Sequence, residues 1–233
     1  MVLFLNIISD FFYLIFPRIC AACGNNLYVQ ENSICTRCLY ELPRTNFYLD
    51  NDNEIARLLW GRVKLEAATS YYYYYKGSKF QNIIHRLKYN GQKHVGYDMG
   101  KLFGKYIKDT SSTDIDIIHP VPLHYRKLKI RGYNQSEIIA RGISESINKP
   151  VITDILYRAK AAETQTVKNR YDRWENIEGV FRATNAGKAE NRHILLVDDV
   201  ITTGSTIEAC ASEILKIKNS RVSIAVLAFA KYG

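Results

Sequence analysis

The sequence predicts an α/β fold, in which a parallel sheet is flanked by helices, with a small N-terminal cysteine module attached. Segments with strand and helix patterns alternate along most of the chain. The last of them, residues 222–230, is almost continuously apolar, as central parallel strands are. Two C-x-x-C pairs lie in residues 20–38, a segment rich in turn and polar residues.

The composition is that of a folded protein. A chain of 233 residues is long enough for one well-buried domain and a small appended module. Its 47% hydrophobic and 24% charged residues argue against a disordered or fibrous chain. The net charge of +9 favours polyanionic partners such as phosphates, nucleic acid or acidic membrane surfaces, without selecting among them.

Residues 1–16 are strongly apolar but do not have the pattern of a membrane span or a signal peptide. The segment is shorter than the roughly 20 residues of a spanning helix, and Asn6 and Asp10 interrupt it. We expect an amphipathic helix that packs on the protein, with a membrane-surface anchor as the alternative. Without an export signal, the predicted compartment is the cytoplasm. We predict two units: the N-terminal helix with the cysteine module at residues 1–45, and the main α/β domain at residues 54–233.

The first half of the main domain begins with a short helix at residues 54–60. Aromatic and β-branched residues favour a strand at 66–75, where the run of five tyrosines is interpreted as structural. Apolar residues at helical spacing predict two helices, around residues 80–87 and 99–106, which Asn90-Gly91 separates.

The second half continues the alternation. The remaining elements that we expect are strands at residues 115–121, 151–156, 193–197 and 222–230 and helices at 136–147 and 206–217. Because the carboxyl ends of parallel strands form the ligand-binding edge of such a sheet, the loop after residues 193–197 is the candidate site.

That loop combines acidic and small residues. Asp198 and Asp199 end the predicted strand, and we expect the loop itself to bind a phosphate monoester through Val200, Thr202, Thr203, Gly204, Ser205 and Thr206. Gly204 permits an unusual backbone conformation, and N–H groups at a helix start converge on anions. Ser205 and Glu208 also form a capping-box pattern, which marks a helix start without any ligand.

The acidic pair suits sugar hydroxyls and a magnesium ion. Asp198 and Asp199 can accept hydrogen bonds from the 2′- and 3′-OH of a ribose and assist Mg²⁺ that ligand oxygens hold. An apolar strand ending in two acids also occurs in nucleoside triphosphatases. The chain contains no G-x-x-x-x-G-K-[ST] motif, which makes that alternative a poor one.

Residues 197–206 closely resemble the phosphoribosyl-diphosphate (PRPP) signature of type I phosphoribosyltransferases, and the whole chain resembles the ComF/GntX family. The family resemblance rests on Phe16-Pro17 with the cysteines, Leu87 to Gly91, Pro120 to Leu123, Arg131 to Gln135, Gln165 to Arg173, Asn176 and Phe181. Tyr133 stands where the family usually has Phe. The resemblance implies PRPP as ligand, a link to competence and DNA uptake, and single-stranded DNA and competence proteins such as a helicase as partners.

The resemblance also implies roles for two further loops. Residues 123–131 correspond to the diphosphate loop, with His124, Arg126 and Arg131 as candidate ligand groups. Residues 158–176 correspond to a closing loop that carries Gln165, Arg173 and Asn176, although a disordered surface loop is the alternative. We expect Asp198, Asp199 and Arg173 to serve in catalysis, which would displace diphosphate from ribose C1. The alternative is a non-catalytic protein that handles single-stranded DNA and uses this fold for binding.

The cysteines predict a metal site. The knuckles formed by Cys20 with Cys23 and by Cys35 with Cys38 have the spacing of a tetrahedral Cys₄ zinc centre. A redox pair would leave one knuckle unexplained, and a reducing compartment disfavours disulfides. We therefore expect structural zinc. Cys210 is interpreted as a small buried residue.

Overall fold

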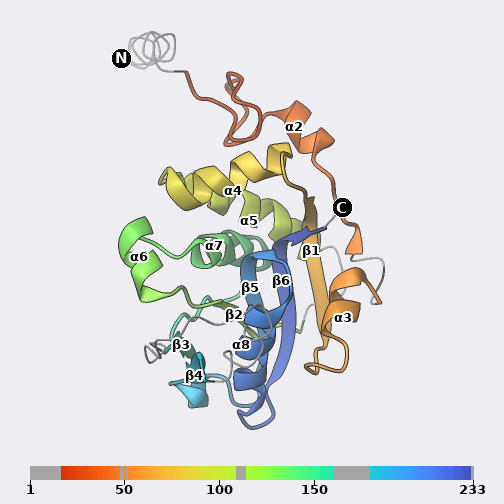
Figure 1. Cartoon of the computed structure of the whole chain (residues 1–233), viewed down its shortest axis with the longest axis vertical. Helices are drawn as coiled ribbons and strands as arrows, with labels where there is room; N and C mark the ends of the chain where they lie inside the picture. Colours follow the sequence, from red (N-terminus) through yellow and green to blue (C-terminus); the bar gives the residue numbers. More distant parts are fainter. Residues whose placement is uncertain (1–16, 48–49, 51, 109–113, 160–178, 232–233) are drawn as a thin grey trace, which may run out of the picture.

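The computed structural model describes residues 17–47, 50, 52–108, 114–159 and 179–231. Four parallel strands form its central sheet, in the order β1-β6-β5-β2 (Figure 1). Their bounds are Ala67–Tyr74 for β1, Ile117–Pro120 for β2, His193–Ile201 for β5 and Arg221–Ala230 for β6. The predicted fold class is confirmed, with β5 and β6 in the centre, where their continuous apolar runs are buried.

Helices cover both faces of the sheet. The first face carries α4 (Lys79–Tyr89), α5 (Lys93–Lys108) and α7 (Gln135–Ile147), and the second carries α3 (Glu54–Leu59) and α8 (Ser205–Leu215). Alternate side chains of β5 divide between two cores: Leu195 and Val197 face the first, Ile194 and Leu196 the second. On the first face α5 and α7 approach so closely that a Cβ on Gly142 would lie 2.2 Å from the carbonyl oxygen of Tyr97.

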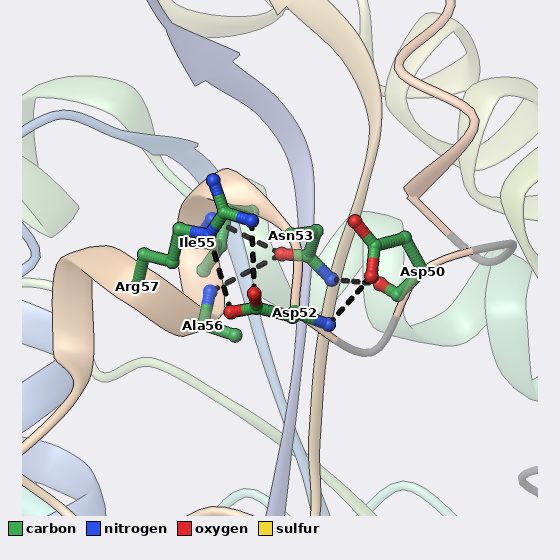
Figure 2. Close-up of polar contacts among 6 residues, drawn as sticks. All are labelled: Asp50, Asp52, Asn53, Ile55, Ala56 and Arg57. Atoms are coloured by element: carbon green, nitrogen blue, oxygen red, sulfur yellow. Dashed lines mark hydrogen bonds and ion pairs between the residues drawn. The ribbon is translucent and has the colours of Figure 1, made fainter.

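Helix α3 is fixed to the sheet by the buried side chain of Asn53, which is 4% exposed. Figure 2 shows its oxygen accepting from the N–H groups of Ile55 and Ala56, while its amide nitrogen donates to Asp50 O. The same nitrogen donates to Ala68 O of β1 at 2.7 Å. The cap therefore sets the position of α3 and of the turn that follows it.

The cysteine module packs on the first face of the sheet domain. It contains α2 (Thr36–Glu41), and its buried Cys20 and Cys38 belong to the same core as α4 and α5. Asn82 of α4 donates to Ala22 O at 2.8 Å, and Ser33 hydrogen-bonds Asp98 of α5. The division at residues 45 and 54 stays a prediction.

The strand expected at residues 151–156 is largely wrong. Only Val151 bridges to Ile118 of β2, and the chain then leaves the sheet. The cause is polar anchoring at Asp154, whose oxygens accept from Thr184, Asn185 and Lys188. Beyond it, β3 (Leu156–Arg158) pairs antiparallel with β4 (Phe181–Ala183), and a 3₁₀ helix follows at Ala186–Lys188.

Two other boundaries also differ from expectation. Strand β5 does not end at Val197 but continues to Ile201, so that Asp198 and Asp199 lie within it. Residues 123–131, expected as a loop, contain helix α6 (Tyr125–Arg131). The apolar residues 1–16 lie outside the described part of the chain. Within that part, no helix has the length and apolar character needed to cross a membrane.

Candidate functional site

The segment after β5 forms the start of helix α8. Gly204 is the N-cap and has φ 78°, a left-handed conformation that favours glycine. Thr202, Thr203 and Thr206 are exposed, and Ser205 lines an open cleft of about 1550 Å³. The first N–H groups of a helix have no partner within it, so this turn presents donors toward solvent. The geometry suits an anion.

The predicted capping box is wrong. No side chain caps α8, because Ser205 Oγ lies 3.1 Å from Thr203 Oγ1 and Glu208 forms an ion pair with Arg62. Arg62 also donates to Thr203 O at 2.9 Å, which joins the turn after α3 to the loop. Leu59 contributes to the same junction, since a Cβ on Gly204 would lie 2.9 Å from its Cδ2.

The two acids differ in their surroundings. Asp198 Oδ1 accepts from Ser136 Oγ of α7 at 2.7 Å and from the N–H of Asp199 at 2.9 Å. Asp199 is buried, and its Oδ2 lies 2.7 Å from the ammonium of Lys88. Burial, together with the adjacent charge of Asp199, raises the pKa of Asp198 to about 7. Asp198 therefore keeps a proton more readily than an ordinary carboxyl.

Lys88 and Ser136 are the residues that the sequence-based site lacked. Both lie in stretches that carry the family resemblance or adjoin it, but their role depends on helices that are distant in sequence. Lys88 lies in the last turn of α4 and Ser136 in the first turn of α7, and both reach the carboxyl end of β5 from the first face. No spacing pattern within one segment would have identified them.

The predicted diphosphate residues lie in and around α6. His124 is its N-cap, and its Nδ1 accepts from the N–H of Arg126. Arg131 donates to Gln135 at 2.7 Å and lies over the ring of Tyr89, 5.3 Å from its centroid. Because Tyr89 follows Lys88 directly, Arg131 is tied to the segment that serves the acid pair. Arg126 is exposed on the same helix.

The remaining predicted residues, Gln165, Arg173 and Asn176, lie outside the described part of the chain. Their assignment to a closing loop stays a prediction. Phe181, by contrast, is described and is buried in β4, in the core of the second face.

The four module cysteines converge as predicted. Their sulfur atoms all lie within 4.8 Å of one another, and the sulfurs of Cys23 and Cys35 are 3.9 Å apart. Zn–S bonds of about 2.3 Å in a tetrahedron place the sulfurs about 3.8 Å apart, so the donor set and its size fit zinc. Cys210 is fully buried in the core of the second face, as expected.

The chain is similar to known proteins over most of its length. The family model for the phosphoribosyl transferase domain matches residues 131–232. Competence protein F of Haemophilus influenzae is 26% identical over 225 residues, which cover 91% of this chain and 96% of that protein. Competence protein ComFC of Bacillus subtilis is 24% identical, covering 85% and 78% of the two chains. DNA utilization protein YhgH of Escherichia coli is 28% identical, covering 58% and 60%.

The parallel sheet, the loop after β5 and the domain match together define a protein with a phosphoribosyltransferase-type domain. The full-length similarity to Competence protein F and the match to ComFC then place it more narrowly. These similarities support the ComF family of competence-associated proteins, with its phosphoribosyltransferase-like domain, as the family of this chain.

Proposed function

We propose that this protein binds a phosphorylated ribose, with PRPP as its ligand, at the carboxyl end of β5. The supporting observation is that one strand carries the acid pair and leads directly into the turn at Gly204 that opens α8. The N–H groups of that turn hold the 5′-phosphate, and Asp198 and Asp199 accept from the ribose hydroxyls. Such a division matches a ligand with an anionic 5′-phosphate and a neutral sugar carrying free hydroxyls.

A second set of groups serves the diphosphate. His124, which caps α6, and Arg126 and Arg131 within it would offer hydrogen-bonding and cationic groups to the diphosphate, and the carboxylates of the acid pair suit Mg²⁺. Bound with the ligand, Mg²⁺ would neutralise charge on the departing diphosphate. The reaction that this set supports is displacement of diphosphate from ribose C1, with Arg173, Gln165 and Asn176 closing over it. The chain is thus a phosphoribosyltransferase or derived from one.

Calorimetry tests the proposal directly. The zinc-loaded full chain is titrated with PRPP in the presence of Mg²⁺. We expect saturable binding with a Kd below about 1 mM, which corresponds to a favourable binding free energy of more than ~4 kcal/mol. Ribose without a phosphate is the matched control and is expected to show no heat. No binding of PRPP at millimolar concentration would reject the proposal. Release of diphosphate with candidate bases, amines and DNA then separates a transferase from a binder.

We further propose that the four cysteines hold structural zinc and that the protein works in the cytoplasm, where thiols stay reduced. Zinc binding would stabilise the module by on the order of 10 kcal/mol, far more than a core of this size supplies. Removing zinc with a chelator should therefore release the module from α4 and α5. Hydrogen exchange would report this release at the N–H of Cys35, which donates to Cys20 Sγ, and at the N–H of Leu39, which donates to Cys35 O.

Single-stranded DNA is a second candidate ligand, and α6 favours it. No side chain of this helix is buried, and it exposes Arg126, Lys127 and Lys129 next to Tyr125 and Ile130. Cationic groups interleaved with apolar and aromatic ones suit phosphates and bases. The names of the relatives, which refer to competence and DNA utilization, agree with this candidate.

The slope of log K against log salt tests DNA binding. Replacing both Lys127 and Lys129 with Glu should reduce the magnitude of the slope by about 1.4, because each phosphate contact on a single strand contributes about 0.7. Lys216→Glu on α8 is the control and should leave the slope unchanged. A DNA affinity that does not change with salt concentration, or that is the same in the wild type and in the α6 variant, would contradict DNA binding by α6.

A further inference from the structure

Lys88 forms a shielded ion pair with the acid pair. Its ammonium lies 2.7 Å from Asp199 Oδ2, and the two side chains are only 22% and 12% exposed. Most ion pairs of the described residues are far more open; Lys101 and Glu145, for example, are 38% and 46% exposed. Shielding from water strengthens the attraction and makes removal of one partner costly.

Contacts of the two neighbouring residues hold the backbone of Lys88 in place. Its neighbour Leu87 is fully buried, and the carbonyl oxygen of Leu87 accepts from the hydroxyl of Tyr133. On its other side, the ring of Tyr89 lies beneath the guanidinium of Arg131. The backbone of Lys88 is thus fixed from both sides.

This arrangement has a consequence for cations. Two adjacent carboxylates attract divalent metal ions, but here one of them is already neutralised by an ammonium. A free metal ion would have to displace Lys88 and leave its charge half-buried without a partner. A ligand that carries a diphosphate offers the ammonium a new anionic partner, and so removes that cost.

We infer that Lys88 is an internal counter-cation with two roles. In the absence of ligand, its ammonium excludes free divalent ions from the acid pair. When the ligand binds, Asp199 turns to the sugar hydroxyls and the ammonium of Lys88 moves to the diphosphate. The inference rests on the proposed function for its second half only. Lys88 is then a positioning and specificity residue. It makes metal binding depend on the ligand, and it favours ligands that join a ribose to a diphosphate over ribose 5-phosphate.

Manganese binding tests the first half without any ligand. The zinc-loaded full chain is titrated with Mn²⁺, and the free ion is followed by electron paramagnetic resonance. We expect Lys88→Met to bind Mn²⁺ at least tenfold more tightly than the wild type, because a charge is removed from the site. Lys88→Arg keeps the charge and should behave as the wild type. Lys101→Met, which breaks an ion pair far more open to solvent, is the matched control and should also change nothing.

PRPP calorimetry tests the second half. Lys88→Met should lose at least tenfold in affinity for PRPP with Mg²⁺ but less than threefold for ribose 5-phosphate, and Lys88→Arg should restore most of the loss. Circular dichroism checks the fold of each variant, and Lys88→Gln replaces Lys88→Met if the latter does not fold.

The outcomes separate the inference from the proposed function. Unchanged Mn²⁺ affinity in Lys88→Met overturns the exclusion of metal ions, whatever PRPP does. Unchanged PRPP affinity in a variant that gains Mn²⁺ overturns the transfer to the diphosphate. If the wild-type chain binds no PRPP, the proposed function is rejected, and so is the movement of Lys88 to the diphosphate. The Mn²⁺ comparison still decides whether Lys88 excludes free divalent ions from the acid pair.

Discussion

The two ends of β5 carry polar clusters of opposite character. At the amino end, His193 Nδ1 lies 2.7 Å from Asp114 Oδ1 and its Nε2 lies 2.8 Å from Ser223 Oγ. Arg221 completes the cluster with an ion pair to Asp114 at 2.7 Å. At the carboxyl end, the same strand carries two adjacent acids, of which Asp199 pairs with Lys88 and Asp198 accepts from Ser136.

The difference between the ends lies in how fully their charges are balanced. Both ring nitrogens of His193 have partners, and His193 and Ser223 are only 3% and 2% exposed. Although the chain Ser223–His193–Asp114 has the connectivity of a hydrolytic triad, its serine cannot meet a substrate. The carboxyl end instead retains an acid whose pKa is about 7 beside an exposed turn. A balanced cluster stabilises a fold, and an unbalanced one is available to a ligand.

The largest effect should come from neutralising the carboxyl end. The variant Asp198→Asn, Asp199→Asn keeps the shape of both side chains but removes the charges that accept from ribose hydroxyls and assist the metal ion. We expect the affinity for PRPP with Mg²⁺ to fall at least 100-fold, or about 2.8 kcal/mol, in calorimetry.

Asp114→Asn supplies the control from the amino end. It neutralises one carboxyl at the opposite end of the sheet, in the turn before β2, and should leave the affinity within twofold. If both variants weaken PRPP binding equally, the contrast between the two ends is wrong.

Substituting the amino end should affect stability and not binding. His193→Ala leaves a cavity and removes the partners of Ser223 and Asp114, at a cost of about 2 kcal/mol in the free energy of unfolding. Urea denaturation measures this cost. PRPP affinity of the folded variant should match the wild type, and a loss of affinity at constant stability would argue that the amino end also takes part in binding.

The sequence predicted the carboxyl end better than the amino end, for a physical reason. The two acids and the turn at Gly204 are contiguous in sequence, so one segment is enough to predict the chemistry of that end. The cluster around His193 joins residues that are 30 and 79 positions apart, and only the parallel register brings them together. The same limit hid Lys88 and Ser136.

The fold shows a similar division. Local sequence patterns predicted all four strands of the central sheet and the five helices that cover it: apolar periodicity for most of them, and aromatic and β-branched content for β1. They failed for residues 151–156, where bonds from Asp154 to distant groups outweigh strand propensity. They also failed for α6, which buries no side chain and so leaves no apolar period to recognise.

The raised pKa of Asp198 predicts how stability depends on pH in the absence of ligand. Between the ordinary pKa of 3.8 and about 7, the folded chain keeps a proton that the unfolded chain has released. The free energy of unfolding should therefore fall as the pH rises through this window and level off above it.

Urea denaturation at several pH values, on the wild type and on Asp198→Asn, isolates this contribution from that of other acids. The stability difference between the two chains should grow in favour of the variant from pH 5 to pH 8. A difference that is constant with pH would mean that Asp198 titrates normally, and the imbalance at the carboxyl end would disappear.

The smallest effect concerns the turn that joins β5 to α8. Gly204→Ala forces a side chain into the left-handed region and against Leu59, which should shift the N–H groups that we assign to the phosphate. We expect about a fivefold loss of PRPP affinity, or ~1 kcal/mol, by calorimetry. Gly77→Ala is the matched control, since Gly77 has φ 81° but open space around it. Its backbone strain is the same, so only Gly204→Ala should weaken binding; equal affinities would show that the turn does not hold the phosphate.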